Sequence, residues 1–138
     1  MIEITKKLPP SREYYNRKIE DWTVLSFTEY LRDKHREQFG IEYAPFGGRW
    51  ATEQGMIGRL IGTKTKEGTH SKATVKRFID EAFKAYKPTP QYPGTNFGFI
   101  YSYRRNILQR VEAEGKTEAR RNKAREEAPS ARDLTDWL

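Results

Sequence analysis

The sequence predicts a mainly α-helical protein, a compact bundle of about four helices with an extended N-terminal arm and a charged C-terminal helix or tail. Apolar residues recur at helical spacing in four segments, and no segment shows the alternating pattern of a useful strand. Clusters of glycine and proline separate these segments. A chain of 138 residues is long enough for one domain with a modest core.

The chain opens with a polar segment, residues 1–21, which contains the sequence LPPS at 8–11. We interpret this segment as an extended arm that precedes a helical core at residues 22–111. Four large side chains are expected to hold the arm against the body: Tyr14, Tyr15, Ile19 and Trp22.

A first helix is predicted to start at Ser26, because Ser26 and Glu29 have the S-x-x-E spacing of a capping box. Gly40 is expected to end it. Histidine at position 35 lies on the apolar side and is expected to be a packed core residue. That side, interrupted only at Lys34, consists of Phe27, Tyr30, Leu31, His35 and Phe39.

A second helix is predicted over about residues 50–61, after a turn-rich connector at 41–48. It contains Gly55 and Gly58, each of which costs about 1 kcal/mol relative to alanine in a helix interior. Two glycines in one short helix predict a close approach by another backbone or by a phosphate, and helix packing is the commoner cause. A flexible loop is expected at residues 62–71.

A third helix is predicted over about residues 72–86, with Ser71 as its N-cap. Its regular apolar stripe contains Val75, Phe78, Ile79, Ala82, Phe83 and Tyr86. Three prolines and a glycine in residues 87–96 form a stiff turn that stops this helix.

A fourth helix is predicted to start near Asn96 and to continue as far as Glu127. Its packing residues are Phe97, Ile100, Tyr101, Ile107, Leu108 and Val111. Mixed charges replace the apolar stripe after residue 111, so residues 112–129 are predicted to be a solvated charged helix or a linker.

Composition limits the chemistry that the chain can perform. It has no cysteine, which excludes a disulfide framework, a thiolate zinc site and a cysteine nucleophile, and it has only two histidines. It has neither an apolar run that could span a membrane nor a signal peptide. We therefore expect no metal, no cofactor and no membrane contact, and a chain that remains in the cytoplasm.

Catalytic motifs do not emerge from the sequence. The segment GRLIGTKT at 58–65 is similar to a phosphate-binding loop, but three residues rather than four separate Gly58 from Gly62. Adjacent carboxylates such as Asp80 and Glu81 point apart on a helix. Because no nucleophile, base and orienting group can be assembled from the sequence, a non-enzymatic role is predicted.

Positive charge is concentrated in the body of the chain. The net charge is +7, and residues 111–138 hold 6 Lys/Arg and 7 Asp/Glu, so residues 1–110 hold the remaining 20 and 12. A basic body indicates a polyanionic partner, most often nucleic acid. The alternative is that the positive charge serves solubility alone.

The second and third predicted helices form a helix–linker–helix unit whose linker is longer than that of a standard helix-turn-helix. His70 in this linker is either a phosphate contact or solvated. Tyr101 and Tyr103 lie among arginines and are either base-stacking or packing residues, with packing favoured for Tyr101. The residues predicted to bind nucleic acid are Arg59, Lys64, Lys66, Lys72, Lys76, Arg77, Arg104 and Arg105.

Residues 50–111 contain the segments MIGRLIG, TVKRFIDEAFKAY and YPGTNFGFIYSYRRNILQRV. These segments resemble a small helical module of DNA-binding or replication accessory proteins from bacteriophages of Gram-positive hosts. The resemblance covers less than half of the chain and consists of apolar patterns rather than catalytic signatures. It implies a phage accessory role, in the cytoplasm of the host cell, and it assigns no functional residue.

The chain ends on SARDLTDWL, residues 130–138, after a proline that separates this peptide from the charged segment. Leu134, Trp137 and Leu138 are spaced so that one helical turn presents all three on one side. So short a helix is stable only against a groove, which predicts a partner-binding peptide. The alternative is that Trp137 docks on the protein's own body. The pattern also resembles tail peptides with which some phage proteins grip a sliding clamp or polymerase.

Two functions are compatible with these observations. In the first, the basic body binds DNA with little or no sequence specificity, and the C-terminal peptide recruits a replication or transcription protein. In the second, the chain is an inhibitor or adaptor that binds a host nucleic-acid enzyme and does not bind DNA itself.

Overall fold

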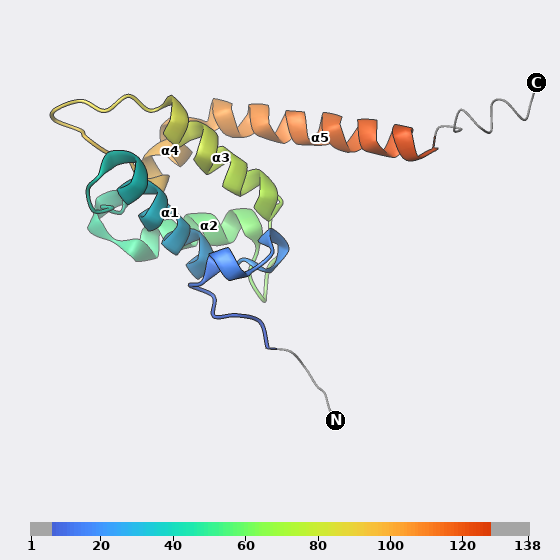
Figure 1. Cartoon of the computed structure of the whole chain (residues 1–138), viewed down its shortest axis with the longest axis horizontal. Coiled ribbons are helices and arrows are strands. Elements are labelled where there is room, and N and C mark those ends of the chain that lie inside the picture. Colours follow the sequence, from blue (N-terminus) through green and yellow to red (C-terminus); the bar gives the residue numbers. More distant parts are fainter. Residues whose placement is uncertain (1–6, 128–138) are drawn as a thin grey trace, which may run out of the picture.

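The computed structural model describes residues 7–127, and this part of the chain is helical and contains no strand. Five α-helices occur in the order α1 (Val24–Phe39), α2 (Trp50–Ile61), α3 (Lys72–Ala85), α4 (Phe97–Tyr103) and α5 (Arg105–Glu127) (Figure 1). Three single turns of 3-10 helix accompany them: η1 (Tyr14–Asn16), η2 (Ile19–Asp21) and η3 (Phe46–Gly48). The prediction of a mainly α-helical class is confirmed.

Helix α3 lies at the centre of the packing and contacts α2, α4 and α5. Its predicted apolar stripe is confirmed, since Val75, Phe78, Ile79 and Phe83 have no exposed surface. Side chains from α1, α2, α4 and α5 close around this stripe and bury, among others, Phe27, Leu31, Ile57, Leu60, Phe97, Ile100, Leu108 and Val111. The predicted stripe on the first helix is confirmed at Phe27, Leu31 and His35.

Helix α1 begins two residues before the predicted start. Thr23 is its N-cap, and Ser26 is the third helical residue, whose hydroxyl accepts a hydrogen bond from the Thr23 backbone N–H at 3.0 Å. The capping box is therefore formed by Thr23 and Ser26 rather than by Ser26 and Glu29. The predicted end is confirmed, because Gly40 adopts the left-handed conformation (φ 72°) that favours glycine.

The single helix expected from Asn96 to Glu127 is two helices. The chain bends at Arg104 (φ −128°, ψ 32°), where the Arg104 N–H still bonds to the Ile100 carbonyl. The bend allows one apolar group, Phe97 and Ile100, to enter the core beside α2 while Ile107, Leu108 and Val111 pack along α3. A straight helix presents a single stripe and could not serve both surfaces.

From Ser11 onward the N-terminal arm is folded onto the body rather than extended. The Tyr14 hydroxyl donates to Asp33 on α1 at 2.7 Å, and the Ser26 hydroxyl donates to the Ser11 carbonyl at 2.6 Å. Trp22 is buried against Tyr14, with ring centroids 5.3 Å apart. Tyr15, in contrast, is 68% exposed and does not hold the arm as predicted.

The two glycines of α2 do not mark a close backbone approach. A Cβ atom at Gly58 would make ordinary contacts of 3.5 Å with Thr63 and 3.8 Å with Val24. A Cβ atom at Gly55 would meet only the Arg59 side chain, at 3.7 Å. The expectation of another backbone close to these glycines is therefore wrong for the described contacts of α2, whereas the alternative of a phosphate stays a prediction.

A buried carboxylate, which the sequence analysis did not identify, holds α2 to the start of α4. Glu53 on α2 has no exposed surface, and its Oε1 atom accepts the Tyr43 hydroxyl at 2.6 Å. Its Oε2 atom accepts the backbone N–H groups of Phe46 and Gly98, both at 3.0 Å. The Tyr43 hydroxyl accepts the Phe97 N–H at 2.8 Å, so one network joins α2, η3 and α4.

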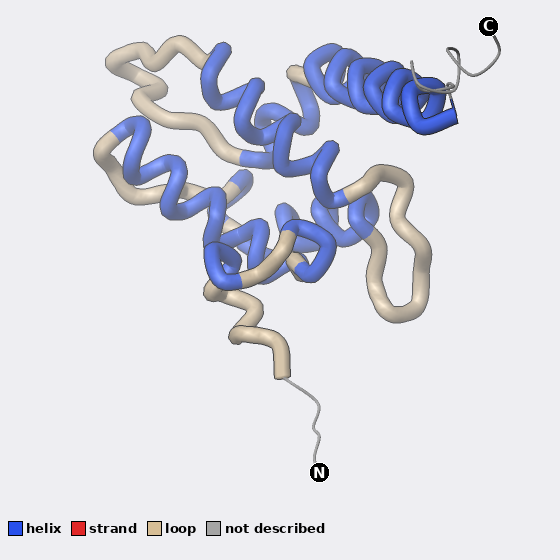
Figure 2. Tube along the Cα trace, turned by 45° about the vertical axis from the view of Figure 1, so that its right-hand side comes forward, coloured by secondary structure: helices blue, strands red, loops and turns tan. Residues whose placement is uncertain are grey.

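Helix α5 leaves the body after its first two turns (Figure 1). Its last buried residue is Val111, and every residue from 116 to 126 is exposed. The connections on either side of α3, residues 62–71 and 86–96, extend at opposite ends of that helix (Figure 2). Within residues 7–127, no helix is long and apolar enough to cross a membrane.

Candidate nucleic-acid interface

The eight predicted basic residues fall into three environments rather than one patch. Four lie around the loop that precedes α3, two on the exposed side of α3, and two at the junction of α4 and α5. The first and last groups are at opposite ends of α3: Lys72 opens this helix, while Arg110, five residues after Arg105, reaches Glu81 in its C-terminal half. One compact phosphate contact therefore cannot include all eight.

The loop group consists of Arg59, Lys64, Lys66 and Lys72. The loop itself is closed by hydrogen bonds, because the Thr63 N–H donates to the Lys66 carbonyl at 2.8 Å. Lys64, Lys66 and Lys72 border a hollow of about 660 Å³ whose wall includes the apolar side chains of Trp22, Leu25 and Ile61. Within residues 7–127, no member of the loop group forms an ion pair with a carboxylate.

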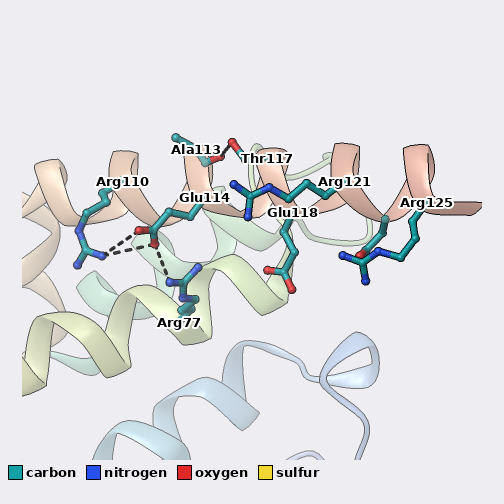
Figure 3. A pocket seen from close by; sticks show the side chains of 9 residues that line it. Arg77, Arg110, Ala113, Glu114, Thr117, Glu118, Arg121 and Arg125 are labelled. Carbon is teal, nitrogen blue, oxygen red and sulfur yellow. Dashed lines mark hydrogen bonds and ion pairs between the residues drawn. The ribbon is translucent and has the colours of Figure 1, made fainter. Parts of the chain in front are cut away.

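The two cations on α3 are already paired with carboxylates. Lys76 Nζ lies 2.9 Å from Asp80, which also accepts the Tyr30 hydroxyl. Arg77 lies 2.6 Å from Glu114 on α5 (Figure 3). A phosphate would have to compete with these carboxylates, so Lys76 and Arg77 are poorer candidates for phosphate contact than the loop group.

Figure 3 shows the groove in which the Arg77 pair lies, between α3 and the projecting part of α5. Glu114 is shared, since Arg110 also reaches it at 3.4 Å and extends to Glu81 on α3 at 3.3 Å. These pairs are partly exposed, and each contributes little to stability, typically about 0–1 kcal/mol. Together they connect α5 to α3 and pair Arg77 and Arg110 with carboxylates.

The junction group, Arg104 and Arg105, lies against aromatic rings. The Arg104 guanidinium is 5.4 Å from the Phe99 ring centroid, and the Arg105 guanidinium is 4.0 Å from that of Tyr101. Among residues 7–127 neither arginine has a carboxylate partner. Tyr101 stacks on buried Phe97 at 5.8 Å, which supports a packing role, while Tyr103 is 65% exposed.

Both histidines have partners in the structure. His35 is buried, and its Nδ1 atom lies 3.0 Å from the Ile41 carbonyl, as expected of a packed core histidine. His70 lies 2.8 Å from Glu112 on α5, so it joins the loop to that helix rather than standing alone in a basic loop. Within the described residues, no group of three potential ligands could hold a metal ion.

A second aromatic and basic region adjoins the junction group and was not predicted. Residues 86–96 and the start of α4 surround a hollow of about 500 Å³. Its wall includes Tyr86, Lys87, Tyr92 and Phe99, and Tyr92 is 62% exposed. The sequence signal for it is Tyr92, a large aromatic residue between Pro90 and Pro93 in a segment whose composition predicts only a turn.

The predicted partner-binding residues Leu134, Trp137 and Leu138 lie outside the described residues. The structure therefore leaves the C-terminal peptide as a prediction. Comparisons with protein-family models, with characterised proteins and with solved structures found no match to this chain. The resemblance to phage accessory proteins accordingly stays a prediction.

Proposed function

We propose that this protein is a non-enzymatic accessory protein that binds nucleic acid through its basic body. The observation that supports this most directly is the presence of two groups of cations, at opposite ends of α3, that have no carboxylate partner among residues 7–127. Charges that serve solubility alone have no need to gather, whereas Lys64, Lys66 and Lys72 border one hollow and Arg104 and Arg105 lie together against aromatic rings. Unpaired lysines and arginines are the groups that displace counterions from phosphates.

Salt dependence tests this proposal. If the four loop residues and the two junction arginines each contact a phosphate of duplex DNA, the logarithm of affinity falls against the logarithm of salt with a slope of about −5.4, since each contact contributes about −0.9. Replacing Lys64 and Lys66 with glutamine should flatten the slope by about 1.8.

The paired cations of α3 provide a matched control. Lys76→Gln combined with Arg77→Gln removes the same charge from the same end of the molecule, but from residues already held by Asp80 and Glu114. We expect this variant to change the slope less than Lys64→Gln with Lys66→Gln. Equal effects from the two variants would show that overall charge, rather than the loop group, governs binding. Failure of the parent protein to bind at low salt would overturn the proposal.

A protein partner is the second candidate function, and the projecting part of α5 favours it. Residues 116–126 are all exposed and carry mixed charges, so this part of α5 has no packing role within the described chain. A polar helix that extends from a domain is suited to bridging two molecules. In this case the chain is an adaptor or inhibitor of a host nucleic-acid enzyme, which is also compatible with the sequence.

A tagged pull-down with and without nuclease separates the two functions. Capture of a replication or transcription protein that survives nuclease indicates direct protein binding, whereas loss on nuclease treatment indicates a bridge of nucleic acid. Deletion of residues 130–138 tests the C-terminal peptide in the same experiment. We expect this deletion to leave stability and DNA binding unchanged and to remove the partner. A large fall in melting temperature with no lost partner would assign the peptide to the fold.

A further inference from the structure

Exposed aromatic rings gather at one place on the described surface. Three tyrosines between residues 7 and 127 are exposed: Tyr15, Tyr92 and Tyr103. Tyr15 lies in the N-terminal arm, but Tyr92 lines the 500 Å³ hollow beside Phe99, and the Tyr103 ring lies 5.2 Å from the Phe99 ring. Of the three exposed tyrosines, Tyr103 thus packs against Phe99, and Tyr92 lines the same hollow as Phe99.

The backbone that carries Tyr92 is held in place. Residues 87–96 contain three prolines, whose rings fix φ and reduce the freedom of the free chain. The Tyr86 hydroxyl donates to the Tyr92 carbonyl at 2.8 Å, and the Tyr92 N–H donates to the Thr89 hydroxyl at 3.0 Å. Tyr92 is therefore presented on a constrained loop, which lowers the entropy cost of binding a ligand.

Positive charge borders these rings. Arg104 lies over Phe99 and Lys87 lines the hollow, and neither pairs with a carboxylate among residues 7–127. Exposed rings with cations beside them match a ligand that alternates flat aromatic groups with negative charges. Nucleic acid has this alternation, with one base and one phosphate in each nucleotide.

We propose that the surface formed by Tyr92, Phe99 and Tyr103 is a base-stacking site for single-stranded nucleic acid. This inference rests on the proposed nucleic-acid function and names the form of nucleic acid that this part of the interface selects. Stacking on a protein ring requires a base whose face is free, and in a duplex the neighbouring base pairs cover both faces. Lys87 and Arg104 then contact the phosphates on either side of the stacked base.

The test compares the affinity of the full chain for oligo-dT, for oligo-U and for duplex DNA, by fluorescence anisotropy at one salt concentration. We expect tighter binding to at least one single strand than to the duplex. Tyr92→Leu should weaken single-strand binding about 5-fold or more, since loss of one stacked base costs about 1–3 kcal/mol. The oligo-dT and oligo-U measurements decide whether the selected strand is DNA or RNA.

Tyr15→Leu is the matched control, because it removes an equally exposed tyrosine from outside the surface. It should leave both affinities unchanged. Duplex binding by Tyr92→Leu should also be unchanged, and so should the salt slope, because no phosphate contact is removed.

The outcomes distinguish this inference from the proposed function. Equal affinity for single strands and duplex, or single-strand binding that is the same in Tyr92→Leu and in Tyr15→Leu, would overturn the stacking site and leave the phosphate interface of the loop group intact. Absence of binding to any of the three probes would overturn both. Tight binding of a proline-rich peptide to this hollow, lost in Tyr92→Leu while nucleic-acid binding is retained, would also overturn the stacking site.

Discussion

Replacement of Glu53 by glutamine is the most demanding test of the fold, because it changes one atom in a fully buried network. The carboxylate accepts three hydrogen bonds, from Tyr43, Phe46 and Gly98, at 2.6, 3.0 and 3.0 Å. Glutamine keeps one acceptor oxygen, which can serve the two backbone N–H groups. Its NH₂ group then faces the Tyr43 hydroxyl, which already accepts the Phe97 N–H.

The expected cost follows from the bonds that change. Two charge-assisted bonds become neutral, a loss of about 1 kcal/mol each, and the Tyr43 O–H becomes a buried donor without an acceptor, which costs about 1–3 kcal/mol. Removal of a buried charge offsets part of this, because a desolvated carboxylate is itself unfavourable. We therefore expect Glu53→Gln to lower the free energy of unfolding by roughly 2–5 kcal/mol.

Urea unfolding followed by circular dichroism measures this change. Glu37→Gln is the control, because Glu37 is exposed on α1 and pairs with no cation among residues 7–127. It should shift the free energy by no more than about 0.5 kcal/mol. A double-mutant cycle with Tyr43→Phe should show a coupling of about 0.5–3 kcal/mol. A Glu53→Gln variant as stable as Glu37→Gln, with additive effects in the cycle, would refute the network.

Three other predictions concern stability. Phe78→Ala should lower the free energy of unfolding by about 3–5 kcal/mol in the same assay, because Phe78 is fully buried on α3, and unchanged unfolding would show that this stripe is not core. Gly55→Ala should raise the free energy of unfolding by about 0.5–1 kcal/mol, since an added Cβ meets only the Arg59 side chain at 3.7 Å. A lower free energy of unfolding in this variant would mean that the helix needs glycine at this position. The pKa values of Tyr14, Tyr30 and Tyr43 are raised above 10. Burial is the largest cause, and a nearby carboxylate that accepts a hydrogen bond from the hydroxyl adds to it. Above about pH 10 the folded state keeps these protons while the unfolded state releases them, so the free energy of unfolding should fall as pH rises. Tyrosinate absorbance that reaches its full value before the protein unfolds would contradict this prediction.

The sequence was sufficient for features that depend on neighbouring residues. The apolar stripe of α3 follows from helical spacing alone, because residues three and four apart share one face wherever the helix lies. The end of α1 at Gly40 follows from the one residue type that adopts a left-handed backbone at little cost. The helical class could be predicted for the same reason, since periodicity is a local property.

Features that depend on distant residues were decided only by the tertiary structure. The sequence does not indicate which of two cations, Arg77 or Lys64, is paired with a carboxylate. Packing of α5 on α3 places Glu114 beside Arg77 and leaves Lys64 without a carboxylate partner among residues 7–127. The break at Arg104 likewise results from two separate surfaces that one straight helix cannot cover. Which charges remain available for a partner is a property of contacts between helices, and helical periodicity carries no information about such contacts.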